Sequence, residues 1–290
     1  MSVTDERLPG ICDSSDVDRY FWLARDYVNR LVSVHDIKTA GKLPVFPKAH
    51  DQWFSRHARL LTILGWRAAA RLSSARALQR YELPEFHDYS RAPQPHVVIK
   101  SISALGRAGL FAEALPDAKI VLLVRGPMGQ IASRMTGILT GKLPPCRFDR
   151  RLLETPQAER LNATGKTIDH ATPLEKMTWE WLITNQKAFD DLAGRPNACV
   201  VRYADMVADP IRGAQNLFAF ADLPWHPACA SFIQSSVSHR GRARYFQVLR
   251  DGSRGLNKWQ TTLSHDDQSR IAAIVTQSSI GRRCLEALPA

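Results

Sequence analysis

The feature that most constrains the fold is a stretch of twenty residues, 116–135, with the sequence PDAKIVLLVRGPMGQIASRM. An apolar run at residues 120–124 has the composition of a buried strand and ends on Arg125. A turn through Gly126 and Pro127 follows, and residues 128–139 then have the composition of a helix. A strand that passes through a tight turn into a helix is the repeating unit of parallel α/β sheets. The stretch therefore predicts an α/β fold.

Two further short segments have strand composition. Residues 97–101 (VVIKS) precede a helical segment at 104–115, and residues 197–206 (NACVVRYADM) follow a long helical segment at 174–194. This order of strands and helices predicts a right-handed parallel crossover. We expect one domain over residues 1–290, built on a parallel sheet flanked by helices. Its first part, residues 1–95, is expected to be mainly helical.

Four more helices are expected from apolar spacing, caps and proline positions. Those before the first strand cover residues 13–34 and 55–80, and those after the last strand cover residues 210–223 and 265–288. The helix at 55–80 carries six arginines, which we interpret as a solvated face because no base-reading motif accompanies them.

The composition indicates an anionic partner. Lys and Arg number 39 against 28 Asp and Glu, a net charge of +11, and the isoelectric point is near 9.7. Nucleic acid, a membrane surface, a nucleotide phosphate and an acidic polysaccharide all satisfy such a charge. The chain has no signal-peptide pattern and no apolar run of membrane-spanning length, so we expect a soluble, cytoplasmic protein with no membrane partner. Its five cysteines are scattered without a C-x-x-C pair, and no metal site is indicated.

Arg125 and Ser133 are the first candidate binding residues. Ligands of parallel sheets bind beyond the carboxyl ends of the strands, where Arg125 is expected. The helix that follows presents free backbone N–H groups and the positive end of its dipole, and Ser133 falls in its first turns. An arginine fork and a serine hydroxyl there suit a phosphate. The alternative is that Arg125 only ends a strand and Ser133 is an ordinary helix serine.

Four segments in register resemble one family. They are VVIKS, LVRGPMGQIAS, VVRYADM and GSRGLNKW. Together they resemble the sulfotransferases that use 3′-phosphoadenosine 5′-phosphosulfate (PAPS), and look closest to the carbohydrate O-sulfotransferase branch. The resemblance covers residues 96–275. It implies a fold similar to that of P-loop nucleoside triphosphatases, PAPS as co-substrate, no metal, and a carbohydrate or small hydroxyl compound as acceptor.

The resemblance also implies roles for particular residues. In the family, the arginine and serine bind the 3′-phosphate, a role carried over to Arg125 and Ser133. Tyr203 is the corresponding adenine contact, although a half-buried strand aromatic explains it as well. Arg254 and Gly255 stand in the loop that closes on the 3′-phosphate, with Lys258 a weaker candidate. Gly126 replaces an aspartate that is usual at this position in the family.

The catalytic residues are less well marked. Lys100, at the end of its strand, is the candidate for stabilising charge on the bridging oxygen, or else a solvated lysine. The general base is unassigned among Glu85, His87 and His50. The glycine-rich loop that holds the 5′-phosphosulfate in the family is not recognisable, so we expect poor sulfate transfer with some nucleotide affinity. A truncated or inactive relative that only binds nucleotide stays open, as does a basic nucleic-acid-binding protein, although no nucleic acid is expected.

Overall fold

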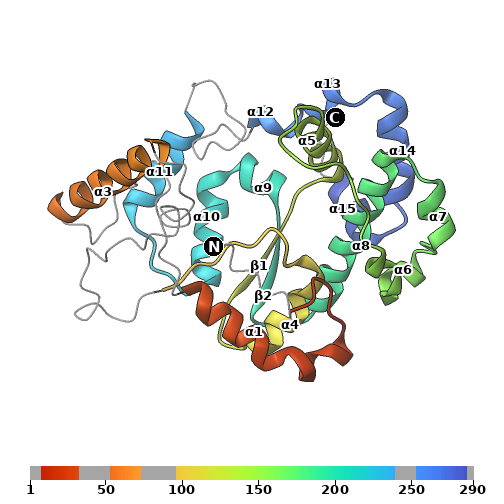
Figure 1. Ribbon diagram of the computed structural model, residues 1–290, viewed down its shortest axis with the longest axis horizontal. Coiled ribbons are helices and arrows are strands. Elements are labelled where there is room, and N and C mark those ends of the chain that lie inside the picture. The colour runs from red at the N-terminus through yellow and green to blue at the C-terminus, as the bar shows by residue number, and fades with distance from the viewer. Residues whose placement is uncertain (1–7, 33–52, 73–95, 239–252, 286–290) are drawn as a thin grey trace. The chain divides into compact units, whose positions relative to one another are not determined.

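The computed structural model describes residues 8–32, 53–72, 96–238 and 253–285, which form two compact units. The smaller unit comprises Met1–Leu8 and Trp22–Ser101, and the larger comprises Pro9–Phe21 and Ile102–Ala290. Figure 1 shows the elements of both units along the chain.

In the smaller unit the described structure is helical, as expected. Helix α1 (Val17–Val32) runs into this unit from the larger one, and α3 (Trp53–Leu72) lies wholly within it. The strand expected at residues 97–101 is wrong, because this segment has no regular structure and its side chains are exposed. Strand formation depends on a pairing partner, and among the described residues the only paired strands are two others, at 120–124 and 198–202.

The larger unit contains a parallel sheet, so the α/β fold with helices around a parallel sheet is confirmed. Strands β1 (Ile120–Val124) and β2 (Ala198–Arg202) pair in register from Ile120 opposite Ala198 to Val124 opposite Arg202. These are the two strands in the described residues. Leu122 and Val124 are buried in the core, whereas Val121 and Leu123 point to the other face of the sheet and are exposed.

Helix α8 (Pro173–Leu192) is the centre of the larger unit. Its start is fixed by Pro173 at the first helical position and by a capping box, in which Thr172 and Glu175 satisfy each other's backbone N–H groups. Gly194 follows its end with a positive φ of 71°. The helix packs against both strands and against several helices, and Figure 1 shows it between the sheet and the C-terminal helices.

The remaining elements of the larger unit are helices and 3₁₀ turns. Those before α8 are η1 (Ser14–Asp16), η4 (Leu105–Arg107), α4 (Ala108–Ala114), α5 (Pro127–Leu139), η5 (Arg150–Glu154), α6 (Pro156–Arg160) and α7 (Gly165–His170). Those after β2 are α9 (Tyr203–Ala208), α10 (Pro210–Phe220), α11 (Pro227–Val237), α12 (Ser253–Leu256), α13 (Trp259–Thr262), α14 (His265–Val275) and α15 (Ser279–Leu285).

The C-terminal helix expected over residues 265–288 is two helices, α14 and α15. The helical structure is interrupted between Val275 and Ser279, and Gly281 of α15 packs directly on the end of α14. A Cβ atom at Gly281 would lie 1.9 Å from the carbonyl oxygen of Val275, so this crossing requires glycine.

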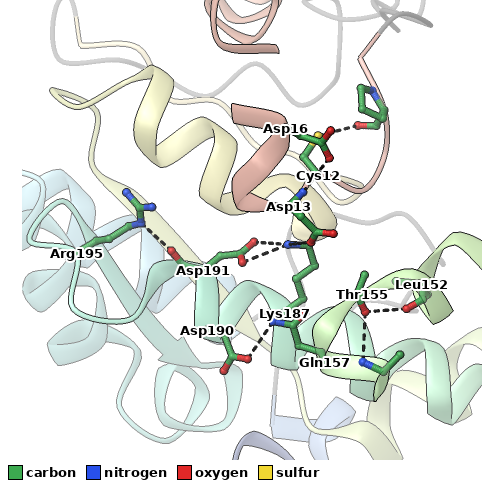
Figure 2. A network of polar contacts seen from close by, with 12 residues as sticks. Cys12, Asp13, Asp16, Leu152, Thr155, Gln157, Lys187, Asp190, Asp191 and Arg195 are labelled. Atoms are coloured by element: carbon green, nitrogen blue, oxygen red, sulfur yellow. Dashed lines mark hydrogen bonds and ion pairs between the residues drawn. The ribbon is translucent and has the colours of Figure 1, made fainter. Parts of the chain in front are cut away.

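A buried ion pair network joins the start of the chain to α8. The side chain of Lys187 is 1% exposed, and its Nζ atom lies 3.1 Å from Asp13 and 2.9 Å from Asp191 (Figure 2). Burial alone lowers the pKa of Lys187, but the hydrogen bonds to these two carboxylates outweigh it and raise the pKa. Lys187 therefore stays charged and holds residues 9–16 against α8.

Candidate functional site

The candidate site begins at the carboxyl ends of the two strands. The paired register ends at Val124 and Arg202, so the next residues, Arg125 and Tyr203, leave the sheet side by side. The Arg125 guanidinium carbon lies 5.7 Å from the centre of the Tyr203 ring, within the range of a cation–π contact. Both side chains are half-buried. A flat aromatic ring and a guanidinium thus stand together where ligands of parallel sheets bind.

Helix α5 adds Ser133 to this edge. Gly129, Ala132, Ser133 and Thr136 recur at intervals of three and four residues and lie on one face of the helix, which lines a pocket with Arg125. Gly129 leaves room for the arginine, since a Cβ atom there would lie 3.3 Å from Nε of Arg125. The guanidinium therefore lies against the first turn of α5, close to the positive end of the helix dipole.

The opposite wall of this pocket comes from the segment α12–α13. Gly255, Lys258, Trp259 and Thr262 face α5 across a cavity of about 170 Å³. Its described lining contains two cations, Arg125 and Lys258, the hydroxyls of Ser133, Thr136 and Thr262, and no carboxylate. Cationic groups and hydroxyls without a competing acid suit a phosphate or sulfate ester. The hydroxyls of Thr136 and Thr262 already donate to the carbonyls of Ala132 and Lys258. Arg125, Lys258 and Ser133 are the groups in this lining that fit the 3′-phosphate of the expected nucleotide.

Buried tryptophans hold both walls in place. The Trp181 indole N–H of α8 donates a hydrogen bond to the carbonyl of Arg125 at 3.2 Å, which fixes the backbone where β1 ends. Trp259 is buried in the core and lines the pocket, so it anchors α13 against α5. Arg134 and Glu180 form an ion pair of 2.8 Å that further joins α5 to α8.

Arg202, the last residue of β2, is engaged in hydrogen bonds within the protein. Its guanidinium makes two hydrogen bonds to Asp205, of 2.8 and 2.7 Å, and a third to the carbonyl of Arg283. The hydrogen bond to Asp205 raises the pKa of Arg202. Nearby, burial raises the pKa of the Cys284 thiol, which lines an adjoining small pocket beside Gly126. Cys284 is therefore a neutral thiol at physiological pH.

Gly126 does not need to be glycine. It caps α5 with φ of −53° and ψ of 144°, an extended conformation open to any residue, and a Cβ atom would meet only ordinary contacts. The replacement of the usual aspartate thus leaves the backbone of the turn in a regular form. What changes is the cap, because a glycine offers no side-chain oxygen to the first N–H groups of α5.

The other expected residues are placed less completely. Lys100 is exposed, and it belongs to the smaller unit. Arg254 lies in α12, one residue before Gly255. Glu85, His87 and His50 lie outside the described residues. Their proposed roles stay predictions.

Three residues that contribute to the pocket were not expected from the sequence. Gly129, Thr136 and Thr262 line the pocket without having been singled out. The first two share a helix face with Ser133, so helical periodicity was a usable signal for them. Thr262 has no such local signal.

Comparison with known families agrees with this geometry. Residues 30–227, more than half of the chain, match the model of the Sulfotransferase family. The chain therefore belongs to the sulfotransferase family, and it is a transferase by that membership. The match starts well before residue 96, so the likeness extends into the N-terminal helices, and it ends before Arg254 and Gly255. A comparison with curated proteins found no match.

Proposed function

We propose that this protein transfers a sulfuryl group from PAPS to a hydroxyl group. The observation that carries the proposal is the pocket between α5 and α12–α13, to which Arg125, Ser133, Gly255 and Lys258 all contribute. Its two walls come from segments far apart in the sequence, with Ser133 on one side and Gly255, 122 positions later, on the other. Membership of the sulfotransferase family supports the reaction class.

Each residue then has a distinct task in binding the nucleotide. Arg125 pairs its fork with the 3′-phosphate, and Ser133 donates a further hydrogen bond. Lys258 adds charge from the opposite wall, and Gly255 lets the backbone approach the phosphate. Arg254, next to Gly255 in the sequence, is proposed to bind the same phosphate. Tyr203, beside the Arg125 guanidinium, offers its ring to the adenine.

The bound nucleotide supplies an activated sulfuryl group, which passes in line to the acceptor oxygen while a base removes the hydroxyl proton; the bond from sulfur to the 5′-phosphate oxygen breaks, and adenosine 3′,5′-bisphosphate leaves. Lys100 stays the candidate for stabilising charge on that bridging oxygen, although the strand expected to place it beside Arg125 does not form. The base is unassigned, and the candidates Glu85, His87 and His50 lie outside the described residues. The acceptor is a carbohydrate or a small hydroxyl compound, in keeping with the resemblance to the carbohydrate O-sulfotransferase branch.

Nucleotide binding tests the pocket directly. Adenosine 3′,5′-bisphosphate should bind, and Arg125→Ala should weaken it by about 10- to 150-fold, the loss of roughly 1.5 to 3 kcal/mol in a charge-assisted contact. Arg134→Ala is the matched control, because it removes the same charge from the neighbouring helix α5 but does not line the pocket. Titration calorimetry on both variants measures the difference. Equal affinity of Arg125→Ala and the control would reject the assignment.

Two further measurements separate the alternatives. Adenosine 5′-phosphate lacks the 3′-phosphate and should compete poorly, because the proposed ligands converge on that group; equal competition overturns the assignment. Transfer of labelled sulfate to a panel of sugar acceptors then tests the reaction. Binding of the bisphosphate without any transfer supports the other candidate, a relative that only binds nucleotide, which the unrecognised 5′-phosphosulfate loop favours.

A further inference from the structure

Helix α3 carries a large apolar surface that no described residue covers. Four of its side chains are strongly exposed: Trp53 at 72%, Phe54 at 75%, Leu61 at 69% and Leu64 at 45%. With 3.6 residues per turn, these four positions fall within an arc of about 100° around the helix axis. Gly65 lies beside the arc, and a Cβ atom there would meet open space. Ile63, turned away from the arc, is fully buried and holds the helix in its unit.

The charge on the same helix is of one sign. Its 20 residues include four arginines and one histidine and no aspartate or glutamate. Arg67 is exposed, and Arg56 is half-buried; both project within about 60° of Trp53, along one margin of the apolar arc. A solvated surface helix of a basic protein ordinarily carries polar groups where α3 carries tryptophan, phenylalanine and leucine.

We infer that α3 binds the surface of a membrane that contains anionic phospholipid. The apolar arc would enter the boundary between headgroups and acyl chains, and the arginines would pair with lipid phosphates. Amphipathic helices with aromatic and leucine side chains on one face and basic residues beside it bind membranes in this way. The helix would lie along the surface, since none of the described helices is long and apolar enough to cross a bilayer. This differs from the sequence-based expectation of no membrane partner.

Anionic lipid is favoured over other occupants by the combination of the two features. A nucleic-acid backbone would use the arginines but would leave four large apolar side chains in water. A folded protein partner would cover the apolar arc. However, α3 has no acidic residue, so its positive charge strongly disfavours neutral or basic proteins. Only an anionic bilayer surface satisfies both the apolar arc and the row of arginines.

Vesicle co-sedimentation of the full chain tests the inference. We expect binding to vesicles of phosphatidylcholine mixed with phosphatidylserine, loss of binding on vesicles of phosphatidylcholine alone, and weakening by salt. The double variant Phe54→Ser, Leu61→Ser should bind at least tenfold more weakly. Both side chains are exposed, so the variant should fold, which its circular dichroism and melting temperature would verify. Leu139→Ser, at an 83% exposed leucine on α5, is the matched control and should bind normally.

Two outcomes would overturn the inference. Failure of the unaltered chain to bind the mixed vesicles rejects it. So does equal binding by the double variant, because attraction by the general positive charge of the protein would then explain the result. A nucleotide-binding measurement on the double variant should be unchanged, so this test is independent of the proposed reaction.

Discussion

Replacing Gly129 by alanine should change stability and ligand binding in opposite directions. Gly129 lies in the first turn of α5, where a glycine costs roughly 0.5 to 1 kcal/mol relative to alanine, so the variant gains helix stability. Its new Cβ atom would lie 3.3 Å from Nε and 3.5 Å from a terminal nitrogen of Arg125. The contact with Nε is tighter than ordinary packing, so the guanidinium must move by a few tenths of an ångström.

That movement displaces the fork that is proposed to hold the 3′-phosphate. A charge-assisted hydrogen bond contributes roughly 1.5 to 3 kcal/mol. Misaligning the hydrogen bond from Arg125 to the phosphate loses part of this free energy, so adenosine 3′,5′-bisphosphate should bind about 3- to 10-fold more weakly. Thermal melting without ligand and calorimetric titration with ligand measure the two effects on the same sample. Gly65→Ala, in a helix outside the site with open space around its Cβ, should gain stability without losing affinity. Unchanged or tighter binding by Gly129→Ala would refute the position assigned to the Arg125 guanidinium.

Two further predictions concern the framework that supports the site. Lys187→Met should lower the free energy of unfolding by roughly 3 to 5 kcal/mol in denaturant titrations, because it leaves Asp13 and Asp191 without their buried cation. As a control, Arg150→Met removes an exposed cation and should lower the free energy of unfolding by at most about 1 kcal/mol. Equal losses in the two variants would contradict the reasoning. Hydrogen bonds from the backbone and hydroxyl of Thr172 lower the pKa of Glu175, so its stabilisation is present above the unfolded pKa of about 4.3 and is lost as pH falls through the lower folded pKa. Glu175→Gln should therefore unfold more easily at pH 7, and its difference from the unaltered chain should shrink in acid; a constant difference across this pH range would show that the carboxylate charge is not involved.

Local sequence determined the elements that build the inner wall of the site. The apolar run at 120–124, the proline at the start of α5 and the capping box of α8 each act within a few residues, so their signals appear directly in the sequence. The same locality placed Arg125 at a strand end and Ser133 on the helix that follows. Strand β2 was also expected, although it ends at Arg202 and Tyr203 begins a helix.

Tertiary structure decided what depends on partners distant in sequence. Residues 97–101 have strand composition but belong to no strand in the described residues, and the helix expected over 265–288 is interrupted after Val275, where Gly281 packs against its end. The exposed arc of α3 is likewise invisible to periodicity, which shows that a helix has an apolar face but not whether that face is covered. Burial of Trp259 brings Lys258 and Gly255 to face Ser133, a contact that no local pattern encodes. Propensities and caps act over one or two turns, whereas a binding pocket forms only when separate segments share one core.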